Sequence, residues 1–303
     1  MTVPNAAITA SLIYLALVVG LSIWKLRALK GREGRRPVGE DVKLMRQPGE
    51  ALRRKITELD EQVSDRLMML LAVPVVAAWV PLGLARVFTQ THAFGWLLSA
   101  GALFALSIVV CLRRLTLVAE QFRNYRLGLA GERFVADNLA ELAIKGYAIF
   151  HDVPCQGARG MFNLDHVVVG GGGVAVIETK TRRKKTADEG SKKNPVTYDG
   201  MVLDWPCGFR DHESVKQAVG NARWLKTHLQ ENLNIRTEPL PVLTIPGWWV
   251  EAKAREPIAA LNPLTLAAAL PARMAKTLSA AETDQIVRNL AKLCRDVDFN
   301  DPV

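Results

Sequence analysis

Residues 163–181 read NLDHVVVGGGGVAVIETKT, and this stretch decides the fold that the sequence predicts. Two runs rich in β-branched residues flank Gly170–Gly173, and glycine readily adopts the positive φ that tight hairpin turns need. The stretch therefore predicts an antiparallel hairpin. Whether the loop has two residues or four, paired residue numbers sum to 343, so that Asp165 lies opposite Glu178.

The predicted register places three charged side chains on one face of the hairpin. Side chains directly opposite one another lie ~5 Å apart, and like charges there are destabilising. Lys180 shares the face of Glu178 because side chains alternate along a strand. Two carboxylates this close usually share a proton or a metal ion, and a nearby lysine can activate a water or stabilise developing phosphate charge. Asp165, Glu178 and Lys180 are therefore the candidate catalytic residues.

Around the hairpin, the pattern is that of an α/β protein. Hydrophobic periodicity predicts helices over 127–145, 212–230 and 279–295, and strands over 147–153, 163–169, 174–181 and 240–250. The last helix begins with Ser279-x-x-Glu282, which has the form of a capping box. Glu132 lies on the apolar stripe of the first helix, where a metal site would give it a partner. A glutamate placed in a first helical turn by the helix dipole fits the position equally well.

Three apolar runs precede this domain. They cover residues 6–24, 67–85 and 93–112, and each is long enough to cross most of a ~30 Å hydrocarbon core. Basic residues follow the first run and flank the outer ends of the other two. This charge pattern predicts an N-terminus outside the membrane and the α/β domain in the cytoplasm. For the second and third runs, the alternative is a pair of buried helices in a soluble core.

The predicted organisation has five parts. They are a transmembrane helix (1–24), a basic cytoplasmic connector (25–66), a transmembrane hairpin (67–112), an α/β domain (113–252) and a C-terminal helical extension (253–303). Within the connector, residues 49–66 have helical spacing. An amphipathic helix near the bilayer and a solvated or self-associating helix both fit that stretch.

Charge and cysteine content narrow the class of protein. The net charge of +9 suggests a polyanionic partner, and four cysteines without a CxxC pair argue against a disulfide scaffold or a zinc ribbon. The connector holds 12 basic and 8 acidic residues, which positive-inside topology explains.

Beyond the connector, basic residues gather between positions 182 and 193. A path for a nucleic-acid backbone and a solvated loop fit this run equally well. The run contains Arg182, Arg183, Lys184, Lys185, Lys192 and Lys193.

Four motifs occur in an order that resembles a known family. They are Gly131-Glu132 at the head of a helix, Asn163-Leu-Asp165-His-Val-Val-Val-Gly170, Glu178-Thr-Lys180, and Gln217-Ala-Val-Gly-Asn221. Together, over roughly residues 126–250, they resemble the nuclease-related domain (NERD) family of the PD-(D/E)xK nuclease superfamily. The resemblance implies a restriction-endonuclease-like mixed sheet flanked by helices. Asn163-Leu164 stands where the superfamily's proline would precede the aspartate.

The resemblance also implies roles for the site residues. Asp165 and Glu178 would be metal ligands and Glu132 an accessory ligand. Lys180 would activate water or stabilise charge, and Gln217 would support the site or contact the substrate. Oxygen ligands without clustered histidine or cysteine favour Mg²⁺ or Mn²⁺ over zinc. A metal-activated water would then attack the phosphodiester in line.

The sequence therefore predicts a membrane-anchored, metal-dependent nuclease that hydrolyses DNA or RNA. Its expected partners are nucleic acid and membrane lipid, and its expected location is the cell (inner) membrane, as a multi-pass protein. One alternative is a catalytically silent module that tethers nucleic acid or a signalling partner to the membrane. Another is a membrane scaffold that works through its apolar helices and connector.

Overall fold

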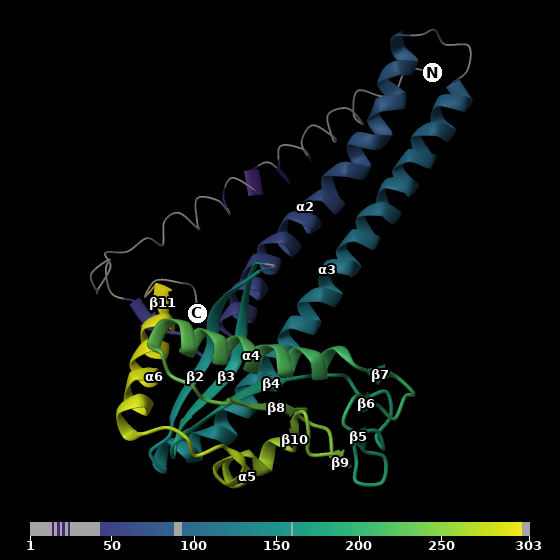
Figure 1. Cartoon of the computed structure of the whole chain (residues 1–303). Helices are drawn as coiled ribbons and strands as arrows, with labels where there is room; N and C mark the ends of the chain where they lie inside the picture. Colours follow the sequence, from purple (N-terminus) through teal and green to yellow (C-terminus); the bar gives the residue numbers. More distant parts are fainter. Residues whose placement is uncertain are drawn as a thin grey trace. The chain divides into compact units, whose positions relative to one another are not determined.

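The computed structural model describes residues 43–87, 93–158 and 160–298, together with positions 14, 17, 18, 20, 21 and 24 (Figure 1). The chain divides into two compact units. One unit comprises Met1–Pro37 and Ile56–Asn124, and the other comprises Val38–Lys55 and Tyr125–Val303. The second unit therefore takes residues from both sides of the apolar segments.

A five-stranded mixed sheet forms the centre of the second unit, in the order β10-β8-β4-β3-β2. Its strands are β2 (Ala148–Gly157), β3 (Gly160–Gly170), β4 (Gly173–Thr179), β8 (Leu240–Thr244) and β10 (Ala259–Leu261). Strand β3 pairs antiparallel with β2 and with β4. Strand β8 pairs parallel with β4 and with β10. The predicted mixed α/β sheet is confirmed.

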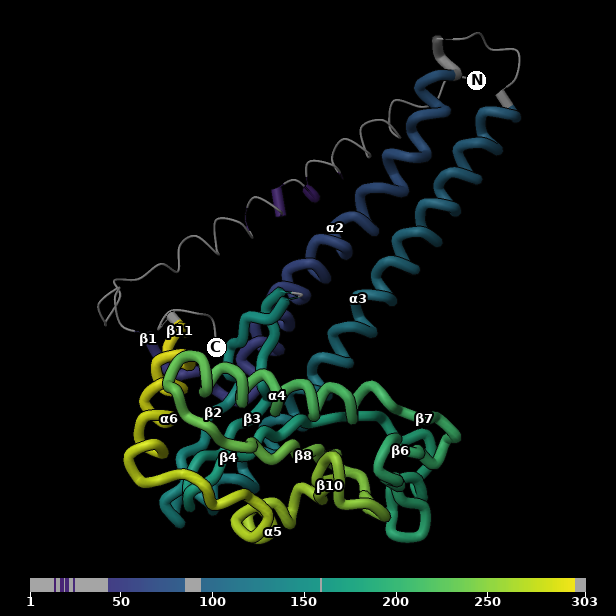
Figure 2. Tube along the Cα trace, in the orientation of Figure 1, coloured from purple at the N-terminus to yellow at the C-terminus, as the bar shows by residue number. Residues whose placement is uncertain are grey.

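Helices cover both faces of this sheet (Figure 2). On one face pack α4 (Glu213–Leu233) and α6 (Ala280–Leu293); on the other pack the C-terminal part of α3 (Ala93–Ile144) and α5 (Leu266–Arg273). Successive side chains along β3 and β4 point to opposite faces of the sheet, so each face has its own hydrophobic core. Val167, Val169, Val174 and Val176 contact the α4 side, whereas Val168, Ala175 and Ile177 contact the α3 side.

The β3–β4 hairpin has the predicted register. Val169 pairs with Val174, and the ladder continues to His166 and Ile177. Gly171 and Gly172 form a two-residue turn with φ values of 59° and 83°, and positive φ at both central residues is what type I′ hairpin turns require. Because the turn fixes the pairing, it also fixes which side chains share each face.

Other elements differ from the sequence-based expectation in extent. The helix expected at 127–145 is the end of the 52-residue α3, and the strand expected at 240–250 stops at Thr244. The chain turns after that strand, where the Trp248 N–H donates to the Ile245 carbonyl at 3.1 Å. The capping box is confirmed: the Ser279 hydroxyl accepts from the Glu282 N–H, and the Glu282 side chain accepts from the Ser279 N–H.

Several short elements carry too little periodicity to be predicted. A second sheet has the order β7-β6-β5-β9 and consists of β5 (Val196–Tyr198), β6 (Leu203–Asp204), β7 (Arg210–Asp211) and β9 (Val250–Ala252). A two-stranded sheet pairs β1 (Lys43–Met45) with β11 (Arg295–Asp298), and a 3₁₀ turn, η2 (Pro263–Thr265), precedes α5. Strand β1 thus joins part of the expected connector to the α/β unit.

Two helices are long and apolar enough to cross a membrane. They are α2 (Glu50–Val87), which includes the expected span at 67–85, and α3, which begins with the expected span at 93–112. Within their apolar windows only 11% and 6% of the residues are buried, so neither helix is mostly buried. Among the described residues these are the two helices that meet this description. The expected span at 6–24 and connector residues 25–42 lie almost wholly outside the described residues.

Candidate active site

Asp165, Glu178 and Lys180 come together at one end of the hairpin, as the register predicts. The Lys180 ammonium donates to Glu178 Oε1 at 2.6 Å, and only 2% of the Glu178 side chain is exposed. The regular β3–β4 ladder ends at His166 and Ile177, and beyond it Asp165 Oδ2 accepts the Thr179 N–H at 2.7 Å. The Asp165 carboxylate thus takes the place of a strand carbonyl, which fixes its position.

Helix α4 supplies two amides to this cluster. Gln217 Oε1 accepts from the Lys180 ammonium at 2.8 Å, and Asn221 Nδ2 donates to Glu178 Oε2 at 2.7 Å. The two residues lie four positions apart, so they share one face of the helix. The structure therefore joins Gln217 to the site, as predicted. It adds Asn221, whose signal in the sequence was its spacing from Gln217.

Glu132 approaches from α3, in the layer on the opposite face of the sheet. It is 8% exposed and lies on the stripe of Val135 and Leu139, which is buried against the sheet. Because α3 begins at Ala93, Glu132 is not in a first helical turn, and that alternative is excluded. Its Oε2 is buried and has no hydrogen-bond partner among the described residues.

The electrostatics of the cluster favour bound protons or a bound cation. Burial raises the pKa of Asp165 well above its usual range, and the charges of Glu178 and Glu132 raise it further. Burial also raises the pKa of Glu178, although Lys180 and Asn221 oppose this. For Glu132, burial and then the charges of Asp152 and Glu178 raise the pKa to about 8. Burial disfavours the Lys180 ammonium, but Glu178 outweighs it and the pKa of Lys180 is raised. Three carboxylates therefore share one lysine.

Residues 127–244 match the family model described as the nuclease-related domain (NERD). These residues form a nuclease-related domain. The match contains Glu132, Asp165, Glu178, Lys180 and Gln217, so every predicted catalytic residue lies inside it. The resemblance that the motifs indicated over roughly 126–250 is confirmed. Comparison with curated proteins and with solved structures gives no match to the chain.

The donor set of the nuclease-related domain suits a hard divalent cation. Asp165 and Glu178 offer carboxylate oxygens, and the unpartnered Glu132 Oε2 is an oxygen of the same kind. In the part of the chain that the structure describes, however, no three His, Cys, Asp or Glu side chains form a group able to hold a metal ion. The chemistry of the donors fits Mg²⁺ or Mn²⁺, with the two hairpin carboxylates as the ligands the protein would supply.

Beside the site, three side chains of the basic run rest on aromatic rings. The Arg182 guanidinium lies 4.2 Å from the Phe209 ring centroid and 5.1 Å from that of Trp205. Lys184 lies over Trp248 and Lys192 over Trp249, at 5.6 and 4.7 Å. Such contacts hold a cation near an aromatic face. The run is therefore partly fixed in position, while Arg183, Lys185 and Lys193 are exposed.

A histidine pair lies next to the site in the sequence but has a different setting. His151 Nδ1 and His166 Nδ1 are 2.8 Å apart, and His166 is fully buried. Burial lowers the pKa of His151 to about 4 and lowers that of His166 well below its usual range. Both rings are therefore neutral near pH 7, one Nδ1 donating to the other. This favours a structural role for His166.

Proposed function

We propose that the nuclease-related domain hydrolyses phosphodiester bonds of DNA or RNA in a reaction that depends on Mg²⁺ or Mn²⁺. The observation that carries this proposal is the pair of Asp165 and the buried Glu178, with Lys180 held against Glu178. The family match supports a nuclease-related role. The exposed Arg183, Lys185 and Lys193 of the basic run would contact backbone phosphates, as would the ring-supported Arg182, Lys184 and Lys192.

The proposed mechanism assigns separate roles to the hairpin carboxylates, Lys180 and Asn221. Asp165 and Glu178 would hold the cation, which when bound polarises a phosphoryl oxygen and lowers the pKa of a water. Lys180 is held between Glu178 Oε1 and Gln217 Oε1, which leaves one of its three N–H groups to orient the attacking water or stabilise developing phosphate charge. Asn221 holds the second oxygen of Glu178 in place.

We also propose that the chain is a multi-pass protein of the cell membrane, with the nuclease-related domain in the cytoplasm. Only 11% and 6% of the residues in the apolar windows of α2 and α3 are buried, which would be costly in water. The basic residues that follow 6–24 and flank 67–112 support an N-terminus outside.

Cleavage by the full chain in detergent tests the catalytic proposal. DNA and RNA, single-stranded and double-stranded, are incubated with Mg²⁺, with Mn²⁺ or with a chelator. We expect metal-dependent cleavage that falls by about 10²-fold or more in Lys180→Ala. Lys216→Ala is the matched control, because Lys216 is an exposed lysine of α4 paired with Glu213, and it should keep full activity. Absence of cleavage of every substrate, or equal activity in Lys180→Ala, would contradict the proposal.

One observation favours a second candidate function. Since no three-ligand group occurs among the described residues, a module that binds nucleic acid at the basic run without cutting it is compatible with the same fold. In the assay above, retained nucleic-acid binding without cleavage under any metal would support this candidate.

A further inference from the structure

The segment that leads into α2 packs on the nuclease-related domain. We call residues 43–51 the N-terminal strap. Its strand β1 pairs with β11, with Lys43 opposite Asp298 and Leu44 opposite Val297. The Arg46 N–H then donates to the Cys294 carbonyl at 2.9 Å. The strap is thus fixed along the C-terminal end of the chain by its backbone.

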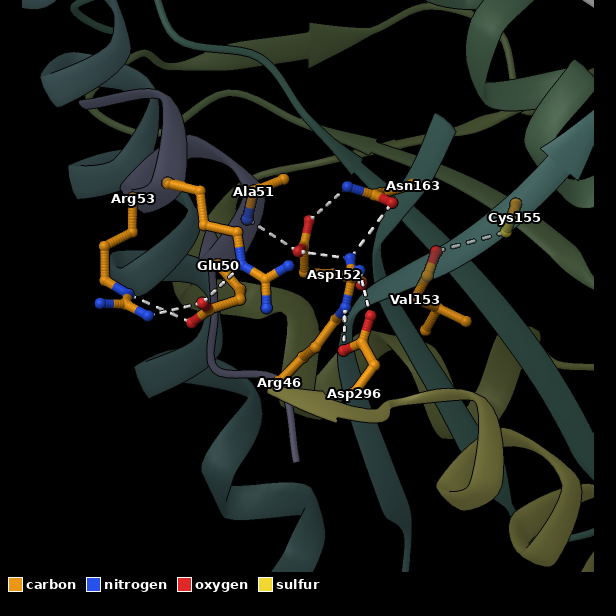
Figure 3. A network of polar contacts seen from close by, with 10 residues as sticks. Arg46, Glu50, Ala51, Arg53, Asp152, Val153, Cys155, Asn163 and Asp296 are labelled. Atoms are coloured by element: carbon orange, nitrogen blue, oxygen red, sulfur yellow. Dashed lines mark hydrogen bonds and ion pairs between the residues drawn. The ribbon is translucent and has the colours of Figure 1, made fainter. Parts of the chain in front are cut away.

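Arg46 anchors the strap through its side chain, as Figure 3 shows. Its Nη1 donates to Asp152 Oδ2 and to the Asp152 carbonyl, each at 3.0 Å. Its Nε and Nη2 donate to the two carboxylate oxygens of Asp296 at 2.7 and 2.6 Å. Only 10% of the Arg46 side chain and 5% of the Asp152 side chain are exposed, so this pair is a buried, charge-assisted contact, whereas the Asp296 side chain is 39% exposed.

Asp152 ties the other end of the strap to the central sheet. Its Oδ2 also accepts the Ala51 N–H at 2.9 Å, and its Oδ1 accepts from Asn163 Nδ2 at 3.0 Å. Asp152 has a φ of 48°, which is unusual for a residue other than glycine. The network overdetermines this conformation, because both carboxylate oxygens and the carbonyl of Asp152 have donors.

Between these two anchor points, the strap passes directly over α3. Gly49 has a φ of 72°, and a Cβ built on it would lie 3.4 Å from Glu132 Oε2 and 2.5 Å from Leu129 Cδ1. The Gly49 backbone also interacts with the Glu132 carboxylate. A Cβ at position 49 would overlap Leu129 Cδ1 and would touch Glu132 Oε2, so the strap lies closely against α3 beside that carboxylate.

We infer that Arg46 is a positioning residue of the active site. By fixing the strap, it holds Gly49 against Glu132 and keeps that carboxylate directed towards the Asp165–Glu178 pair. The catalytic unit is then discontinuous, because a segment that leads into α2 completes a site whose other residues follow α2 in the chain. This inference rests on the proposed nuclease function and adds a residue that lies outside the 127–244 family match.

The test compares Arg46→Ala, Arg46→Lys and Arg288→Ala in the full chain in detergent. Arg288 is a matched arginine, since it pairs with Asp284 on the exposed face of α6. Two readouts are measured: kcat and KM for the best substrate of the panel, and amide hydrogen exchange. We expect Arg46→Ala to lower kcat by about tenfold to a hundredfold with KM nearly unchanged, as small misplacements of catalytic groups do. Arg46→Lys should recover part of kcat, and Arg288→Ala should match the wild type.

Hydrogen exchange separates positioning from general destabilisation. In Arg46→Ala, exchange should become faster in the strap and around Glu132, while the β3–β4 hairpin stays protected. Faster exchange of the hairpin as well would show that Arg46 merely stabilises the fold, and an unchanged kcat would also overturn the inference. If the wild type cleaves nothing, the nuclease proposal fails, while exchange around Glu132 still decides whether Arg46 positions it.

Gly49→Ala gives a second test that leaves Arg46 intact. The added Cβ would overlap Leu129 Cδ1 and displace the strap from α3 beside Glu132, so kcat should fall as in Arg46→Ala. Gly146→Ala is its control, because Gly146 has a comparable φ of 83° and nothing lies within 4 Å of its added Cβ. Equal kcat values in these two variants would contradict a role for the strap at Glu132.

Discussion

Two clusters of carboxylates, each with buried members, lie in the same domain and are neutralised differently. In the arginine cluster (Arg46, Asp152, Asn163 and Asp296), Arg46 donates to both aspartates, and Asp152 is 4% exposed with donors on both oxygens. In the lysine cluster (Glu132, Asp165, Glu178 and Lys180), three carboxylates share one ammonium. Glu132 Oε2 has no partner there among the described residues.

The difference shows which cluster lacks enough positive charge from the protein to balance its carboxylates. Burial raises the pKa of Asp152 and of Asp165 alike. Arg46 opposes that effect at Asp152, whereas two further carboxylates strengthen it at Asp165. A fully paired buried cluster serves structure, and an underneutralised one is where a cation or a proton is taken up.

Breaking the arginine cluster should have the largest effect on folding. Arg46→Ala leaves Asp152 buried without its cation, so the free energy of opening the strap should fall by about 3–5 kcal/mol. Arg288→Ala removes an exposed pair and should change it by less than about 0.5 kcal/mol. Exchange of the backbone amides of the strap measures both values, while the β4 amides should stay protected. Equal effects of the two substitutions would remove the distinction between a buried anchor and a surface ion pair.

The lysine cluster should make the metal-free protein less stable as the pH rises. The pKa of Glu132 is about 8 in the folded state, against 4.5 for an unperturbed glutamate. Between these values the folded protein binds a proton that the unfolded chain gives up, so stability should fall as pH rises through this window. Glu132→Gln should flatten the profile, measured by exchange in the presence of a chelator. Stability that rises from pH 5 to pH 8 and does not respond to Glu132→Gln would contradict this account.

The smallest predicted effect concerns the basic run beside the lysine cluster. Arg182 rests on Phe209 and Trp205, so its charge is held in place for a phosphate contact. Arg182→Ala should weaken nucleic-acid binding by about tenfold or less and lower the slope of log affinity against log salt by about 1. Binding titrations at several salt concentrations measure this, with Arg288→Ala as control. An unchanged salt slope would place the phosphate contacts elsewhere.

Local patterns predicted the lysine cluster from the sequence. The hairpin register depends on residues within 20 positions of one another, and it brought Asp165 to Glu178 as expected. Gln217 required a family motif, because nothing local connects α4 to Lys180. Glu132 was ambiguous until the length of α3 was known, since its position within the helix decides between the two interpretations.

The arginine cluster could not be predicted in the same way. Arg46 and Asp152 are 106 positions apart, and Arg46 and Asp296 are 250 apart. Strands of three or four residues, such as β1 and β11, have no usable alternation. Arg46 also stood in a basic connector next to apolar runs, where positive-inside topology already explained its charge. The sequence therefore did not indicate that Arg46 also binds Asp152 and Asp296 in the folded domain.

Calorimetric titration of the full chain with Mg²⁺ tests the central claim most directly, because it asks whether the lysine cluster takes up a cation. We predict that the wild type binds Mg²⁺ and that Asp165→Asn abolishes this binding. Asp284→Asn, which alters an exposed carboxylate of α6, should leave it unchanged. No Mg²⁺ binding by the wild type, or equal binding by Asp165→Asn, would contradict the account.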